Sequence, residues 1–192
     1  MRLQACVFPT SLGWFGLLGQ EACVWRLTIG HRRSEDAWSD LRSHFPEHSV
    51  SKADWHPKLK KRLGQFADGK ADSFADIRLR TEHRTEFQQK VLAATRDIGF
   101  GETLSYGELA ARVGSPNAAR AVGAVMASNQ IPIIIPCHRV VGSRGELVGF
   151  SAPTGLNLKL RLLELEQRVV SSPAKGVSRP RFLRLESHCG SR

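Results

Sequence analysis

The sequence predicts an α+β fold, with a small mixed α/β domain over residues 1–85 and a mainly helical domain over residues 86–167. Two apolar segments separated by turn residues near the N-terminus are typical of a β-hairpin. From Glu86 onward the apolar residues take the spacing of amphipathic helices. A length of 192 residues suits one domain or two small ones.

In the N-terminal part, GWFGLLG and ACVWRLTIG are expected to pair as strands around a turn at residues 19–22. WHPKLKKRLGQFADG has the pattern of a short amphipathic helix that stops at Gly69. The apolar opening of the chain superficially suggests a signal peptide, but Gln20 and Glu21 favour the hairpin. No run of about 18 apolar residues occurs, so we expect no membrane-spanning segment.

The helical part begins with TEFQQKVLAATRDI, which predicts a helix that ends before GFGET. SYGELAARVGSPNAARAVGAVMASN then predicts two short helices around a tight turn. Ser105 can cap the first helix together with Glu108, and Gly-Ser-Pro ends it after Val113. The second helix runs from about Asn117 to Ser128. This is the helix-turn-helix pattern, which plain helical hairpins share.

After this pair, the apolar run at residues 131–135 predicts a short extended segment, and TGLNLKLRLLELEQ predicts a closing helix. The remaining residues, 168–192, are rich in Ser, Pro, Gly and Arg, so we expect a basic and disordered tail.

The outer face of the second helix is nearly bare. Val122, Val125 and Met126 can face the core, which leaves small residues and Arg120 outside. A helix that discriminates bases in the major groove needs several polar side chains, and this one has a single Arg. Close approach to a minor groove is one interpretation. The alternative is that the small residues pack against another helix and Arg120 is solvated.

The net charge of +10 and the isoelectric point near 10.1 favour a polyanionic partner such as nucleic acid. Residues 86–166 are almost balanced, with eight Lys or Arg against seven Asp or Glu. Residues 167–192 have six against one, so the tail alone can account for much of the excess charge.

The four cysteines show neither a CxxC pair nor a regular spacing, which favours a reducing, cytoplasmic setting without disulfides. Cys6, Cys23, His31 and His83 have the side chains that zinc prefers, but their spacing carries no zinc signature. We therefore expect no zinc site.

Cys137 stands out in IPIIIPCHRVV because Pro136 precedes it and His138 and Arg139 follow it. A polar, positive pocket lowers the pKa of a thiol and makes it a nucleophile. Neighbouring side chains of an extended chain point to opposite faces. His138 can therefore assist Cys137 only across a bend or a bridging water, and we expect Arg139 to be an ion-pair partner. The alternative is an inert, buried cysteine.

FQQKVL, GETLSYGELA, AARAVGAVMASN, IPCHRVV and TGLNLKLRLLELE stand in the order and nearly the spacing of O6-alkylguanine-DNA alkyltransferases, which the chain resembles over residues 87–166. The resemblance implies a ribonuclease H-like N-terminal domain and a winged helix-turn-helix-like C-terminal domain. It implies a monomer that binds double-stranded DNA and lies in the cytoplasm, or in the nucleus of a eukaryote. Members of that family transfer the alkyl group of O6-alkylguanine, and less readily that of O4-alkylthymine, to their own cysteine. Each molecule reacts a single time and needs no cofactor.

The resemblance also implies a role for individual residues. Cys137 would accept the alkyl group, His138 would act as base through water, and Glu166 would orient His138. Tyr106 would donate a hydrogen bond to N3 of the guanine. Arg120 would fill the gap that the flipped base leaves, on a DNA-binding face with Tyr106. Ala118, Ala119 and Gly123 would complete that DNA-binding face. The positions of the substrate pocket and hinge would be Asn129, Val140, Phe150 and Ser151.

This chain departs from the family in the loop VGFSAPTGL, where Phe150 replaces the usual Tyr and Ala152-Pro153-Thr154 is bulkier than the usual glycines. The shape of the alkyl pocket and the placement of Ser151 are therefore open. Two other functions remain as alternatives: a DNA-damage sensor without transfer, which would not need Cys137, and a Cys-His hydrolase, which would not need Arg120.

Overall fold

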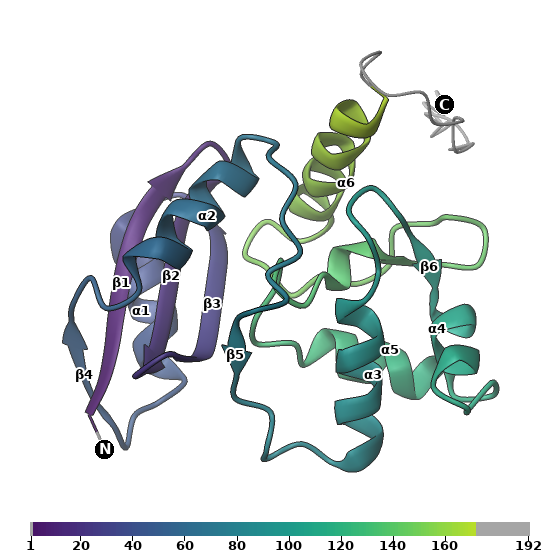
Figure 1. Ribbon diagram of the computed structural model, residues 1–192, viewed down its shortest axis with the longest axis horizontal. Helices are drawn as coiled ribbons and strands as arrows, with labels where there is room; N and C mark the ends of the chain where they lie inside the picture. Colours follow the sequence, from purple (N-terminus) through teal and green to yellow (C-terminus); the bar gives the residue numbers. More distant parts are fainter. Residues whose placement is uncertain (1, 172–192) are drawn as a thin grey trace, which may run out of the picture.

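The computed structural model describes residues 2–171, and it confirms a mixed α/β fold (Figure 1). A five-stranded sheet lies in the N-terminal part, and most helices lie beside it in the C-terminal part, together with a two-stranded sheet. In chain order the elements are β1 (Arg2–Thr10), β2 (Gly13–Gln20), β3 (Cys23–His31), α1 (Ser34–Ser43), β4 (Ser49–Lys52), α2 (Pro57–Ala67), β5 (Arg78–Leu79), α3 (Glu86–Arg96), β6 (Leu104–Ser105), α4 (Tyr106–Arg112), α5 (Ala119–Ala127), the 3-10 helix η1 (Cys137–Arg139), β7 (Val140–Val141) and α6 (Leu156–Val170).

The N-terminal sheet has the order β4-β1-β2-β3-β5. The predicted hairpin is β2 and β3, which pair antiparallel, and β1 pairs antiparallel with β2. β4 and β5 add parallel edges. The helices α1 and α2 lie on opposite faces of the sheet (Figure 1). The predicted amphipathic helix is α2, and its buried residues Leu59, Leu63 and Phe66 join the main core.

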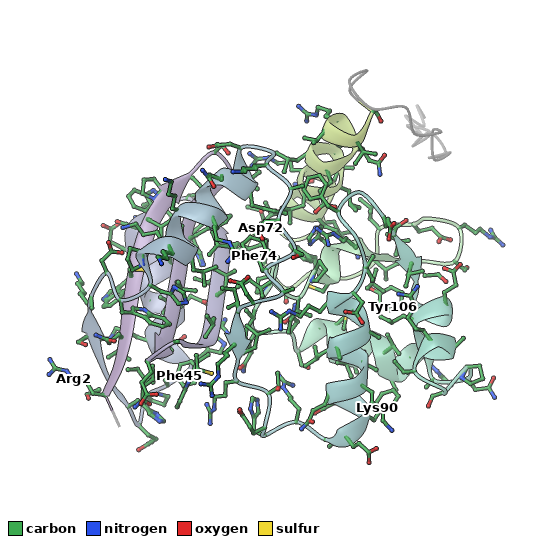
Figure 2. The ribbon with its side chains drawn as sticks, viewed as in Figure 1. Arg2, Phe45, Asp72, Phe74, Lys90 and Tyr106 are labelled. Atoms are coloured by element: carbon green, nitrogen blue, oxygen red, sulfur yellow. The ribbon has the colours of Figure 1, made fainter. Side chains whose placement is uncertain are left out.

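The main core continues from the sheet into the helices, since one cluster of buried side chains contains both Leu27 of β3 and Val122 of α5. The backbone N–H of Leu27 also donates to the carbonyl of Gln130 at 3.0 Å, so β3 is bonded directly to the chain after α5. In Figure 2, Phe74 lies between the sheet and the helices, and Tyr106 lies among the helices. The sheet therefore supports the segment that leads to Cys137.

The predicted pair of helices is α4 and α5, and α4 has the boundaries that its caps predict. Ser105 accepts from the N–H of Glu108, and Glu108 accepts in return from the N–H of Ser105, which is a capping box at the start of α4. Gly114, at φ +76°, follows the end of α4, as suits a residue in the left-handed region. Val122, Val125 and Met126 of α5 are buried, as predicted.

The prediction of an extended segment at residues 131–135 is wrong. The chain turns there, with Ile135 N–H donating to Ile131 O at 3.0 Å, and Ile133 has φ +71°. A β-branched residue is costly in that conformation and persists only where the surroundings fix it. The apolar run correctly indicated burial, but the isoleucines fill a folded turn and do not pair as a strand.

The closing helix is α6, which ends at Val170, so residues 168–170 belong to its last turn. Residues 172–192, most of the predicted tail, lie outside the described residues. Among residues 2–171, no helix is long and apolar enough to cross a membrane.

Candidate functional site

Cys137 begins η1 and is 5% exposed. Burial raises the pKa of its thiol, while a hydrogen bond from Asn129, the charge of Lys159 and nearby backbone N–H groups lower it. Burial outweighs the other influences. The expectation that the surroundings lower this pKa is therefore wrong, and a base has to remove the proton before the sulfur can react.

Asn129 connects the sulfur to the turn that precedes it. Its side-chain N–H group donates to Cys137 Sγ at 3.1 Å and to Ile135 O at 2.9 Å. Its Oδ1 accepts from the N–H of Ile131 at 3.0 Å. Because Asn129 directly follows the C-cap of α5, it joins the end of that helix to the position of the thiol.

His138, Arg139 and Glu166 form a buried cluster beside the thiol. Glu166 Oε1 is 2.9 Å from His138 Nε2 and 2.9 Å from Arg139 Nη2, and Oε2 accepts from Gly101 N–H at 2.9 Å. Burial alone would raise the pKa of Glu166, but its hydrogen bonds and ion pairs with His138 and Arg139 hold that pKa at about 2. The pair with Glu166 makes Arg139 the ion-pair partner that we expected, and Arg139 also donates to Ile98 O at 2.6 Å.

The cluster fixes the protonation of His138. Burial lowers the pKa of its imidazole despite the nearby carboxylate, so the ring is neutral at pH 7. An ionised Glu166 can only accept, which places the ring proton on Nε2 and leaves Nδ1 as an acceptor. Nδ1 is buried and has no hydrogen-bond partner among the described residues. No direct hydrogen bond joins the His138 ring to Cys137 within the described chain.

Lys159 is a site residue that the sequence analysis missed. Its Nζ donates to Val140 O at 2.7 Å and to Val148 O at 2.8 Å, and burial lowers its pKa to about 8. It joins the strand after η1 to the following loop. The available signal was helical spacing: Lys159, Leu162 and Glu166 lie at i, i+3 and i+7 in α6, which puts two charged residues on its buried face.

Tyr106 lies at the start of α4, and its hydroxyl donates to Val148 O at 3.2 Å. A Cβ added at Gly123 of α5 would lie 3.9 Å from the Tyr106 ring, so the small outer face of α5 adjoins the tyrosine. Arg120 on that face is exposed, while Ala118 and Ala119 are partly buried. The structure therefore brings the predicted DNA-binding residues next to one another.

The loop after β7 contributes Phe150 and Ser151 to a hollow of about 240 Å³, which Asn129 also lines. Val140 precedes this loop, and its carbonyl is occupied by Lys159. Asn129 both lines this hollow and donates to the Cys137 sulfur, while Cys137 itself is not among the residues that line it.

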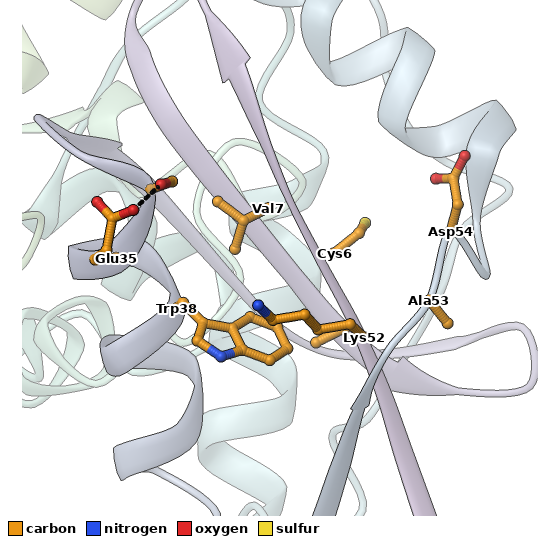
Figure 3. Close-up of a pocket in the computed structure, with 9 residues that line it drawn as sticks. Cys6, Val7, Glu35, Trp38, Lys52, Ala53 and Asp54 are labelled. Atoms are coloured by element: carbon orange, nitrogen blue, oxygen red, sulfur yellow. Dashed lines mark hydrogen bonds between the residues drawn. The ribbon is translucent and has the colours of Figure 1, made fainter.

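A second hollow, of about 500 Å³, lies on the N-terminal sheet between β1, α1 and β4 (Figure 3). Lys52 lies over the Trp38 ring, and Ser34 donates to Glu35. Cys6 lines it, but burial raises the pKa of Cys6 to about 11, and no predicted site residue lies there. Within residues 2–171, no group of three His, Cys, Asp or Glu residues could hold a metal ion.

Comparison with known proteins gives a consistent result. The family model described as "6-O-methylguanine DNA methyltransferase, DNA binding domain" matches residues 86–168. A methylated-DNA-protein-cysteine methyltransferase from Methanosarcina acetivorans is 41% identical over 164 residues, which cover 83% of this chain and 96% of that protein. One from Mycobacterium leprae is 57% identical over 86 residues, 45% of this chain and 51% of that protein.

Solved structures agree with the sequence matches. The structure of Mycobacterium tuberculosis OGT in complex with DNA matches with a TM-score of 0.69 at 33% identity, over 91% of this chain and 96% of that one. The O6-methylguanine methyltransferase of the same organism matches with a TM-score of 0.71 at 33% identity, over 90% and 96%. The similarity thus extends over both the sheet and the helices. The chain belongs to the methylated-DNA-protein-cysteine methyltransferase family.

Proposed function

We propose that this protein repairs double-stranded DNA by transferring the alkyl group of O6-alkylguanine, less readily that of O4-alkylthymine, irreversibly to its own Cys137. The observation that carries the proposal is the position of the Cys137 sulfur. The sulfur lies 3.1 Å from the Asn129 side-chain amide. Cys137 directly precedes His138 in the chain, and His138 is paired with the buried Glu166. Family membership supports DNA repair by alkyl transfer, and the structure of the similar Mycobacterium tuberculosis OGT is a complex with DNA.

The proposed reaction begins with the thiol. Nδ1 of His138 accepts the proton of Cys137 through one bridging water, and Glu166 stabilises the imidazolium that results. The thiolate then attacks the alkyl carbon: the S–C bond forms as the C–O6 bond breaks, and its electron pair remains on guanine. The leaving guanine needs a proton or hydrogen bond at its ring, which Tyr106 supplies at N3 after it releases Val148 O.

The substrate base has to leave the duplex before this reaction. The small outer face of α5 allows close approach to the minor groove, and Arg120 is its long exposed cation. We place Arg120 in the gap left by the flipped base, where it offsets part of the lost stacking. Ala118, Ala119 and Gly123 keep this face small, and the main chain of Val140 and Ser151 contacts the guanine edge.

Stoichiometry tests this proposal. With excess duplex containing one O6-methylguanine, transfer to the protein should plateau at about one methyl group per chain, since formation of the S–C bond is irreversible. Cys137→Ser should abolish the product, and Cys6→Ser should keep it, because Cys6 lies in the other hollow. Continued turnover beyond one equivalent, or transfer by Cys137→Ser, would overturn the proposal.

A further inference from the structure

The linker, residues 80–85, joins β5 to α3 and crosses from the sheet to the helices (Figure 1). It turns at Thr81, whose carbonyl accepts from the N–H of Arg84 at 3.0 Å. Gln89 of α3 fixes the same turn by donating to Arg84 O at 2.9 Å. The backbone of Arg84 is therefore held in place next to the start of α3, and its side chain extends to α5.

The Arg84 side chain binds the C-terminal end of α5. Its Nη2 donates to Ser128 O at 2.7 Å, and its Nη1 donates to Ser128 Oγ at 3.0 Å. Ser128 is the C-cap of α5, so the guanidinium contacts the end where the helix dipole leaves partial negative charge. A cation is stabilising at this end of a helix.

The charge of Arg84 is not cancelled by a neighbour. Burial lowers the pKa of Arg84, and within residues 2–171 its guanidinium makes no ion pair with a carboxylate. Burial and the charges of Arg84 and Arg80 lower the pKa of His83 more than the charge of Glu82 raises it, so His83 is neutral at pH 7. Arg84 therefore brings a whole positive charge to the end of α5.

Asn129, the residue after Ser128, connects this end of the helix to the sulfur. Its side-chain N–H group donates to Cys137 Sγ at 3.1 Å, and this bond favours the thiolate. The partial negative charge at the end of α5 acts in the opposite direction, because it disfavours a nearby anion. Arg84 both holds the C-cap that precedes Asn129 and offsets this negative charge.

Other groups act on the thiol as well. Burial opposes its ionisation, and the charge of Lys159 on α6 favours it. Burial lowers the pKa of Lys159 to about 8, so this charge is lost in alkaline solution, whereas Arg84 stays charged. The remaining titratable groups beside the thiol carry no net charge at pH 7: the uncharged Tyr106 of α4 and His138 of η1, and the ion pair of Arg139 with Glu166 of α6.

We propose that Arg84 is a positioning residue for the alkyl acceptor: it fixes the end of α5 from which Asn129 reaches the sulfur, and its charge favours the thiolate of Cys137. Arg84 acts in this way through Ser128 and Asn129, without touching the sulfur. The inference rests on the proposed role of Cys137 as acceptor. It adds that the linker between the sheet and the helices helps to prepare the thiol for reaction.

Alkylation by iodoacetamide tests the inference without DNA. The full chain is treated over a range of pH, and mass spectrometry follows modification of the peptide that contains Cys137, which gives the midpoint of its thiol titration. Arg84→Met should raise this midpoint by about half a pH unit and slow alkylation below it about threefold, the effect of one charge at a helix end. Single-turnover transfer from O6-methylguanine in a duplex should slow by a similar factor at pH 7.

Two further variants separate the charge from the hydrogen bonds. Arg84→Lys keeps the charge and should recover most of the shift, whereas Arg84→Gln keeps a donor without charge and should not. The matched control is Arg80→Met, which removes another half-buried cation of the linker. The guanidinium of Arg80 lies 3.9 Å from the centre of the Trp25 ring and makes no hydrogen bond to α5 in the described part of the chain. This control should leave the midpoint unchanged.

An unchanged midpoint in Arg84→Met, an equal shift in Arg84→Lys, or full recovery in Arg84→Gln would overturn the inference. A chain that takes no methyl group from O6-methylguanine would instead refute the proposed function. Because the iodoacetamide titration does not depend on that transfer, the two failures are distinguishable.

Discussion

Replacing Glu166 with Gln removes the one carboxylate of the buried cluster while keeping the size of the side chain. The ordinary pKa of a Glu is 4.5, and in the folded chain that of Glu166 is about 2. At about 1.4 kcal/mol for each pH unit, this difference corresponds to about 3 kcal/mol of stability. The value agrees with the roughly 3–5 kcal/mol lost when one partner of a buried ion pair is removed, here leaving the charge of Arg139 unpaired.

The assay is urea unfolding at several pH values. Because the folded-state pKa is the lower one, the ionised carboxylate stabilises the fold above about pH 4.5, and this contribution disappears as the pH falls toward 2. The difference between the unaltered chain and Glu166→Gln should therefore be largest at neutral pH and shrink in acid. Alkyl transfer should also slow, since His138 loses the carboxylate that stabilises its charged form.

Glu164→Gln is the matched control in the same helix. Its side chain is 52% exposed and lies 3.6 Å from Arg168, a geometry worth at most about 1 kcal/mol. If Glu166→Gln unfolded with no greater loss of free energy than Glu164→Gln, the assignment of Glu166 as the centre of the cluster would be refuted.

Three other substitutions have distinct expected outcomes. Arg120→Ala should slow repair in duplex DNA far more than reaction with free O6-benzylguanine, since only the duplex requires flipping; equal losses would contradict the finger role. Asn129→Ala should lower the free energy of unfolding by about 2 kcal/mol or more in urea, because buried groups of the Ile131–Ile135 turn lose their partners; an unchanged value would show that the turn is held otherwise. In the unaltered chain, the rise of the transfer rate with pH should flatten near pH 8, where Lys159 loses the charge that lowers the pKa of Cys137. Lys159→Met should lack this flattening, and a flattening in both proteins would exclude Lys159 as its cause.

Local signals predicted α2 to α6, whereas α1 (Ser34–Ser43) was not predicted. Capping by Ser105 and Glu108, the glycine after α4, and the apolar spacing of α5 each involve residues within a few positions of one another. Such short-range preferences can be recognised in a sequence because the interacting groups are close along the chain. The hairpin of β2 and β3 was predictable for the same reason.

Features that depend on distant contacts were not predictable in this way. The left-handed Ile133 is held by a turn that Asn129 and the core fix, and an apolar run alone resembles a strand. The raised pKa of Cys137 follows from the depth of its burial, which the polar neighbours in sequence did not reveal. β1 was also missed, because it needs the hairpin beside it to pair.

Cys137, His138 and Arg120 stood out from their sequence context, and the roles of the other site residues came from the resemblance; the structure pairs His138 with Glu166. Their roles stay predictions. The ion pair of Arg26 and Asp40 had no signal in the sequence, because it depends on how β3 and α1 pack together.

The most direct test is to locate the transferred group. After reaction with duplex DNA that carries isotopically labelled O6-methylguanine, the protein is digested and the masses of its peptides are measured by mass spectrometry. The account predicts one added methyl group per chain, on the peptide that contains Cys137, and none on those that contain Cys6 or Cys23. Absence of label from the chain, or label on any residue other than Cys137, would contradict it.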